Sequence, residues 1–386
     1  MRATRRKSMC RFTCPRSCLG PQAKSDITRH SPQSRRLPPF PHPPAYYIIG
    51  HANQGSRYSW LTREAPPAST PLASAGLTCA VDIGGTHVRV ALCTNEGRVV
   101  RKSKTPTDRE GGGPAIVRDI LDTASAFATH ASQPVTACGV GFCGPVDFSR
   151  QTTIRSLQVG GWEGVPLALK LSHALNVPAI LDNDGNTGAL GEATFGAGRG
   201  KERVVYMTLS TGVAGGIIMY GQVYRGARHV AGELGHVKVL PDTPTTPRCN
   251  CGRRGCLEAL CSVAGITAIC ERVLGKPLTP RVLFDAAEAG DEGAAAVADE
   301  VAGYVSRAIA SITHTLDPDI VVIGGGIARA GAALFEPLYS ALRRDLLPTY
   351  DPRTLVVPAA LGDDSGLLGA VALARTVTER GVRAAK

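Results

Sequence analysis

Long apolar runs are missing from this sequence of 386 residues. No stretch reaches the roughly eighteen consecutive apolar residues of a membrane-spanning helix, and the first residues lack the uninterrupted apolar core of a signal peptide. We therefore expect a protein that has no membrane partner and stays in the cytoplasm. Its apolar content of 43% is sufficient for ordinary globular cores.

Acidic residues are scarce at the beginning of the chain, and this scarcity accounts for most of the net charge of +11. Residues 1–76 hold 12 of the 43 Lys and Arg but only Asp26 and Glu64 of the 32 acids, which leaves 31 bases and 30 acids downstream. The nearly neutral body gives no reason to expect a nucleic-acid partner. Because residues 1–76 are rich in Pro, Ser and Arg without an apolar period, we predict a disordered basic tail. A transit peptide and a misassigned start codon are the alternatives.

From residue 77 onward the sequence alternates between strand-like and helix-like segments. LTCAVDI, VRVALCT and RVVRKSKT predict three strands joined by short turns, and a helix, a strand, a second helix and a further strand follow. The pair DIGGTHVRVAL and LSTGVAGGIIM repeats one unit of strand, glycine turn and strand, which indicates an internal duplication and two related lobes. We predict an α/β protein with layered sheets covered by helices.

Glycine-rich turns are the first chemical signal. The turns in DIGGT (82–86) and LSTGVAGG (209–216) expose backbone N–H groups that can hold phosphate oxygens, although a tight β-turn explains either one alone. Neither has Walker A spacing, and GAGRGK (196–201) has the Lys without the spacing. VVIGGGIA (321–328) fails the dinucleotide fingerprint because Arg329 occupies the third glycine position. That segment either presents backbone to an adenine or ribose, or permits a helix to pack closely on a strand.

Two carboxylates follow a predicted strand in LDNDGNTGALGE. Loops at strand ends meet ligands in α/β folds, so Asp184 is a candidate to take a proton from a substrate hydroxyl. Asp182 or Asn183 could instead cap the helix that follows, which is the commoner role for such residues.

A cluster of potential metal ligands lies in CNCGRRGC (249–256), thirteen residues after His236. The imidazole and the thiolates of Cys249, Cys251 and Cys256 form the closed tetrahedral set that structural zinc prefers. The spacing CxCxxxxC differs from the CxxC pair of most nucleic-acid fingers and of thioredoxin-like redox sites, which leaves free surface thiols as the alternative. Glu233 and Glu258 would then lie close to the metal, as hydrogen-bond acceptors for a polyhydroxyl ligand. Twelve cysteines in a cytosolic chain otherwise argue against a disulfide framework.

Taken together, these motifs resemble the ROK family (repressor, open reading frame, kinase) over about residues 78–380, and the GH…CxCGxxGCxE pattern is specific to it. The resemblance implies a two-lobed, actin-like (ribonuclease H-like, hexokinase-type) ATPase fold with a zinc-binding loop. It implies a small lobe of residues 77–183, completed by a C-terminal helix 366–386, and a large lobe of residues 184–365.

The family resemblance also implies an activity, namely the transfer of the γ-phosphate of ATP to the 6-hydroxyl of a hexose, with glucose favoured. N-acetylglucosamine kinase, N-acetylmannosamine kinase and a sugar-responsive repressor are the alternatives. A repressor would need a winged helix-turn-helix before DIGGT, and residues 1–76 show no recognition helix. The family further suggests a homodimer or homotetramer.

Specific residues acquire roles from this resemblance. Asp184, in the NDxN motif completed by Asn186, is the implied general base. The implied sugar contacts are Asn183, Glu233, His236 and Glu258. The implied ATP-binding residues are Asp82, Gly84, Gly85, Thr86, Ser210, Thr211, Gly212, Gly215, Gly324 and Gly325. Asp82 is also expected near Mg²⁺ through water, and the zinc ligands are His236, Cys249, Cys251 and Cys256. The metal cluster would thus fix one wall of the sugar site. Departures from the family pattern at Cys143, Ala214, His87 and the SLQVGGW segment concern the choice of sugar more than the reaction.

Overall fold

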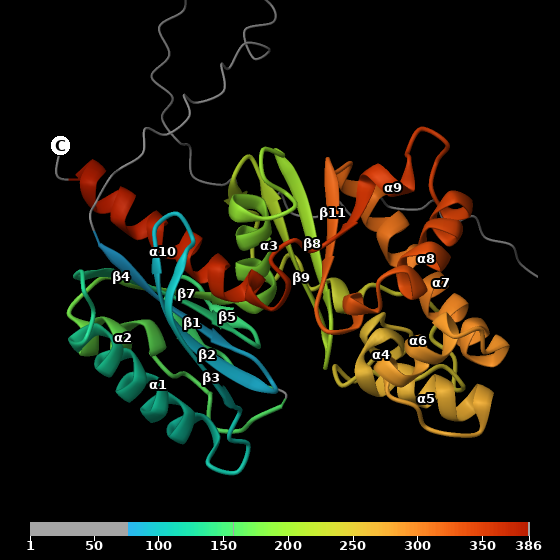
Figure 1. Ribbon diagram of the computed structural model, residues 1–386, viewed down its shortest axis with the longest axis horizontal. Coiled ribbons are helices and arrows are strands. Elements are labelled where there is room, and N and C mark those ends of the chain that lie inside the picture. Colours follow the sequence, from blue (N-terminus) through green and yellow to red (C-terminus); the bar gives the residue numbers. More distant parts are fainter. Residues whose placement is uncertain (1–75, 157, 385–386) are drawn as a thin grey trace, which may run out of the picture. The chain divides into compact units, whose positions relative to one another are not determined.

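The computed structural model of the chain describes residues 76–156 and 158–384 (Figure 1). The predicted disordered tail therefore lies, except for Gly76, outside the described residues. Among the described residues, no helix is both long and apolar enough to cross a membrane.

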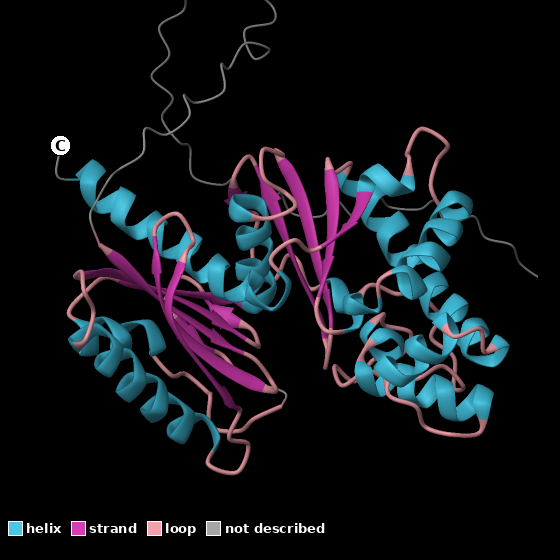
Figure 2. Cartoon of the chain, in the orientation of Figure 1, coloured by secondary structure: helices cyan, strands magenta, loops and turns pink. Residues whose placement is uncertain are grey.

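Two five-stranded mixed sheets form the framework (Figure 2). The first has the order β3-β2-β1-β4-β7. Its strands are β1 (Leu77–Ile83), β2 (His87–Thr94), β3 (Val99–Pro106), β4 (Val135–Phe142) and β7 (Ala179–Asn183). The second has the order β10-β9-β8-β11-β12. Its strands are β8 (Arg203–Leu209), β9 (Val213–Met219), β10 (Gln222–Val223), β11 (Ile320–Gly324) and β12 (Val356–Pro358).

The two sheets share one pattern of strand pairing. In each, two antiparallel pairs are followed by two parallel pairs. The duplication predicted from the two strand–glycine turn–strand units is therefore confirmed. A short separate hairpin, β5 (Val146–Asp147) with β6 (Thr152–Thr153), was not anticipated from the sequence.

Helices cover both faces of the first sheet (Figure 1). Side chains alternate along β1, so that Cys79, Val81 and Ile83 pack in the core that α1 (Gly112–Thr129) and α2 (Leu167–Leu175) cover. Ala80 faces the other way and packs with residues of α10 (Ser365–Ala384).

The second sheet is covered in the same manner. One face contributes Val205, Met207 and Leu209 to the largest core, together with the helices of the C-terminal third. Those helices are α4 (Glu258–Cys261), α5 (Val263–Leu274), α6 (Pro280–Glu288), α7 (Glu292–Leu316), α8 (Ala332–Asp345) and α9 (Pro352–Leu355). The other face, with Val204 and Tyr206, packs against α3 (Asp184–Phe195) and α10.

Glycines allow α3 to approach the second sheet closely. A Cβ added to Gly185, in the first turn of α3, would run into the backbone of Gly215 on β9. A Cβ on Gly216 would come within 2.5 Å of the carbonyl oxygen of Gly185. The first turn of α3 is therefore held directly against the strand that follows the second glycine-rich turn.

Candidate functional site

A pocket of about 640 Å³ is lined by residues from both sheets. It contains most of the residues singled out in the sequence. These are Asp82, Gly84, Gly85, Thr86, Asn183, Asp184, Ser210, Thr211, Gly212, Glu233, His236, Cys251, Glu258 and Gly325. Cys249 and Cys256 are buried and do not line the pocket.

Gly215 and Gly324, both expected to bind ATP, do not line the pocket. A Cβ on Gly215 would collide with Leu234, and a Cβ on Gly324 would come within 2.5 Å of the Tyr206 hydroxyl. Both glycines therefore permit close packing, and their expected contacts with ATP stay predictions. Gly325 does line the pocket, and its φ of +87° favours glycine.

Asp184 is placed by the junction of β7 and α3. The side chain of Asn183 caps α3, because its oxygen accepts hydrogen bonds from the N–H groups of Gly185 (2.8 Å) and Asn186 (3.4 Å). Its amide nitrogen donates to the carbonyl of Gly144 at 3.1 Å. The capping interpretation of Asn183 is therefore confirmed, and Asp184 stands as the first helical residue at the pocket.

The environment of Asp184 raises its affinity for a proton. Burial raises the pKa of this carboxyl to about 7, and the nearby charges of Asp82 and Glu233 act in the same direction. A carboxylate with a pKa near 7 can take up a proton at physiological pH, as a general base must.

Asp82 lies at the end of β1, opposite Arg89 in the register of the first hairpin. Nη1 of Arg89 donates to Oδ2 of Asp82 at 2.8 Å. Burial raises the pKa of Asp82, and the guanidinium opposes that rise. Sequence reasoning missed Arg89, although the hairpin register places the two residues opposite each other.

The two glycine-rich turns meet at the pocket. The turn after β1 is closed by a bond from the Gly84 N–H to the His87 carbonyl at 2.9 Å. The hydroxyls of Thr86 and Thr211, one from each turn, are 3.1 Å apart. The structure thus brings together the two turns that the sequence predicted to act as a pair.

The predicted metal ligands form a compact group. Their ligand atoms all lie within 4.8 Å of one another, with Nδ1 of His236 3.7 Å from Sγ of Cys249 and the Sγ atoms of Cys251 and Cys256 3.8 Å apart. A tetrahedral zinc with bonds of about 2.0–2.3 Å needs ligand separations of about 3.5–3.8 Å, so the group fits zinc. Nε2 of His236 lies 3.9 Å from Oε2 of Glu233, so the ring links the metal group to the pocket.

Glu258 has a role that the sequence did not reveal. Its Oε2 accepts a hydrogen bond from the Val213 N–H at 3.1 Å, and its Oε1 lies 3.6 Å from Sγ of Cys249. The Val263 N–H donates to the Ser210 carbonyl at 3.0 Å, close beside this link. Glu258 therefore connects the cysteine group to the second glycine-rich turn, 45 residues earlier in the chain.

The remaining lining residues include three of the departures from the family pattern, His87, Cys143 and Ala214. Burial raises the pKa of Cys143 to about 12, so this residue presents a neutral thiol to the pocket. Gln158, from the SLQVGGW segment, also lines the pocket, and further lining residues that sequence reasoning missed include Lys104, Arg155, Arg329 and Asp363. Arg329 and Asp363 form an ion pair at 3.1 Å.

Known proteins match this chain over nearly all of its described part. The sequence model of the ROK family matches residues 78–377. A glucokinase of Thermotoga maritima is 35% identical over 307 residues, which cover 76% of this chain and 95% of that protein. An N-acetylmannosamine kinase of Yersinia pestis is 34% identical over 303 residues, covering 78% and 99%.

Solved structures agree. A ROK family glucokinase of Streptomyces griseus, in complex with glucose and AMPPNP, is 32% identical and superimposes with a TM-score of 0.67 over 78% of this chain and 100% of that one. The predicted two-lobed, actin-like α/β fold is confirmed. The chain belongs to the ROK family and is similar to its glucokinases and N-acetylmannosamine kinases.

Proposed function

We propose that this ROK sugar kinase transfers the γ-phosphate of ATP to the 6-hydroxyl of a hexose, and that the hexose is glucose. The observation that carries the proposal is the position of Asp184. Its half-buried carboxyl, with a pKa raised to about 7, shares one pocket with both glycine-rich turns. A proton acceptor and a phosphate cradle in one pocket are the two parts that phosphoryl transfer to a hydroxyl requires.

Asp184 accepts the proton of the 6-hydroxyl in this mechanism. Because the transition state of phosphoryl transfer is loose, the protein acts mainly by positioning and by stabilising charge. The backbone N–H groups around Gly85 and Gly212 are suited to hold the phosphate oxygens. General-base assistance by the carboxylate contributes roughly 10²–10⁴-fold.

Asp82 is the residue we assign to Mg²⁺, through a bridging water. Arg89 engages Oδ2 of its carboxylate, so Oδ1 can still accept a hydrogen bond from a metal-bound water. Bound with ATP, Mg²⁺ neutralises the charge that the phosphates carry.

We assign sugar binding to Asn183, Glu233, His236 and Glu258, all of which line the pocket. Burial raises the pKa of Glu233, and His236 joins it to the cysteine group, which we assign to structural zinc. The metal group would hold this wall in place without taking part in the chemistry. The expectation of a cytoplasmic location rests on the lack of long apolar runs in the sequence, and that of a homodimer or homotetramer rests on the family alone.

A panel of sugars tests the proposal. Purified enzyme is given ATP and Mg²⁺ with glucose, N-acetylmannosamine, N-acetylglucosamine or fructose, and ADP release is measured for each. We expect the highest kcat/KM with glucose, because identity to a glucokinase reaches 35%. N-acetylmannosamine is the second candidate, supported by the relative at 34% identity. A higher kcat/KM for another sugar would reassign the substrate, and DNA binding without any turnover would favour the repressor.

A further inference from the structure

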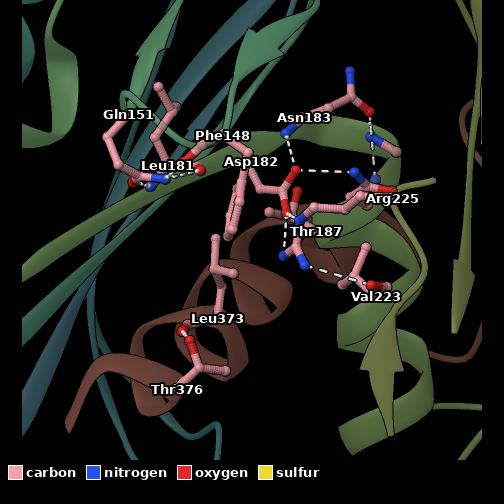
Figure 3. Close-up of polar contacts among 12 residues, drawn as sticks. Phe148, Gln151, Leu181, Asp182, Asn183, Thr187, Val223, Arg225, Leu373 and Thr376 are labelled. Atoms are coloured by element: carbon pink, nitrogen blue, oxygen red, sulfur yellow. Dashed lines mark hydrogen bonds and ion pairs between the residues drawn. The ribbon is translucent and has the colours of Figure 1, made fainter. Parts of the chain in front are cut away.

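An ion pair between a buried carboxylate and a half-buried arginine lies next to the proposed catalytic base. The side chain of Asp182 is 1% exposed, and it does not line the pocket. Its Oδ2 accepts hydrogen bonds from Nε (2.8 Å) and Nη2 (2.5 Å) of Arg225, 43 residues later in the chain (Figure 3). Its Oδ1 accepts from the Asn183 N–H at 2.8 Å and from Nδ2 of Asn186 at 2.9 Å. The carboxylate of Asp182 therefore ties Arg225 to the turn that presents Asp184.

Arg225 is fixed on a second side by an aromatic ring. Its guanidinium lies 3.7 Å from the centre of the Phe148 ring, in the turn between β5 and β6 (Figure 3). That turn is anchored to β7, because Oε1 of Gln151 accepts from the Leu181 N–H at 2.7 Å while its Nε2 donates to the Phe148 carbonyl at 2.6 Å. The guanidinium is thus held by charge and by stacking at once.

Arg225 also begins the segment that carries the proposed sugar contacts. Its carbonyl accepts a hydrogen bond from the Ala231 N–H at 3.0 Å, which closes residues 225–231 into a loop. Val230 of this loop lines the pocket, and Glu233 follows shortly after. The ion pair between Arg225 and Asp182 therefore fixes the position at which this segment begins.

We infer that Arg225 is a positioning residue. Through its ion pair with Asp182, it holds residues 225–236, which include Glu233 and His236, in place relative to Asp184. The inference rests on the proposed function of this pocket. The base Asp184 and the sugar contacts Glu233 and His236 come from separate parts of the chain, so their relative placement depends on contacts between those parts. A displacement of about 1 Å between reacting groups can cost on the order of 10²-fold in rate. A buried carboxylate without a partner is strongly destabilising, so Asp182 favours conformations in which Arg225 stays paired with it.

Substitutions of Arg225 test the inference by separating sugar binding from ATP binding. Arg225→Met keeps the length and the apolar stem but removes the charge, and Arg225→Lys keeps the charge but loses the paired donors. Steady-state kinetics would give the KM of glucose, the KM of ATP and kcat, and thermal unfolding would give Tm. Arg203→Met is the matched control. Arg203 also forms an ion pair, with Asp319 at 3.2 Å, and its guanidinium also lies near an aromatic ring, 5.7 Å from the centre of Tyr220. It lies on β8 and, like Arg225, does not line the pocket, but its ion pair joins Asp319 rather than the turn that presents Asp184.

We expect Arg225→Met to raise the KM of glucose about tenfold or more and to lower kcat, with the KM of ATP changed less than about twofold. Arg225→Lys should raise the KM of glucose about threefold, and Arg203→Met should leave all three constants unchanged. A lower Tm with wild-type kinetic constants in Arg225→Met would overturn the inference, because it would assign the pair to stability alone. An equal rise in both KM values would also overturn it.

The conservative variant and the wild-type assay cover the cases in which Arg225→Met gives no kinetic data. If Arg225→Met does not fold, Arg225→Lys carries the test, and a wild-type KM for glucose in that variant rejects the inference. Failure of the proposed function is recognised separately, because the wild-type protein would then phosphorylate no sugar in the same assay.

Discussion

Replacing Asp184 by Asn should remove catalysis and add stability at high pH. Burial raises the pKa of Asp184 from its ordinary value of 3.8 to about 7, so the folded state holds this proton more tightly than the unfolded state. Between these two values the free energy of unfolding therefore falls as pH rises, and the loss is complete above about 7. A shift of about three pKa units corresponds to roughly 4 kcal/mol at most. The amide of Asn keeps the shape of the side chain but does not ionise, so the variant avoids this cost.

The assay is chemical denaturation of wild type and Asp184→Asn at pH 5 and pH 8, with kinetics on the same preparations. Relative to wild type, the variant should gain about 2–3 kcal/mol of unfolding free energy between pH 5 and pH 8, the part of the linkage that falls in this window. Its kcat should fall by roughly 10²–10⁴-fold, and the acidic limb of the wild-type kcat/KM profile should have an apparent pKa near 7. An equal stability difference at both pH values would refute the raised pKa. A kcat above about a tenth of wild type would reject Asp184 as the base.

Three further predictions concern the metal group, its link to the second turn, and the tail. Cys251→Ser should lower the zinc content from one per chain towards zero and raise the KM of sugar and of ATP, whereas Cys270→Ser, at a buried thiol outside the group, should keep its zinc. A metal-free variant with normal sugar binding would contradict the structural role. Glu258→Ala should weaken ATP binding because the Val213 N–H loses its acceptor, whereas Glu258→Gln should spare it because the amide oxygen can still accept that bond. Calorimetry would give the ATP affinity of both variants, and equal affinities in the two would count against the link between Glu258 and the second turn. Deleting residues 1–75 should leave solubility and turnover intact, and an insoluble or inactive product would contradict the prediction of a disordered tail.

Local sequence patterns predicted the framework and much of the pocket. The repeated strand and glycine-turn unit anticipated two sheets with the same strand order, because a duplicated pattern of apolar residues gives a duplicated fold. A helix cap at Asp182 or Asn183 followed from their place between a strand and a helix, and the structure assigns it to Asn183. The four zinc-type ligands were recognisable because three of them lie within eight residues. The division of the chain into lobes at residues 183 and 184 stays a prediction.

Contacts between distant segments were beyond the reach of the sequence. Glu258 was expected to lie near the metal and to contact the sugar, yet it also accepts a hydrogen bond from the N–H of Val213 on β9. The pairing of Asp182 with Arg225 likewise joins segments whose own patterns show no sign of each other. Gly215 was expected to hold phosphate and Gly324 to present its backbone to an adenine or ribose; no pattern in the sequence indicated that a Cβ at these positions would meet Leu234 and Tyr206. Such roles depend on tertiary neighbours, which no local period encodes.

The product formed from ATP and glucose tests the central claim most directly. Phosphorus and proton NMR of the reaction mixture would identify which hydroxyl carries the new phosphate and how much ADP accompanies it. The account predicts glucose 6-phosphate and ADP in equal amounts. Phosphate on a different hydroxyl, or ADP and inorganic phosphate without a sugar phosphate, would contradict it.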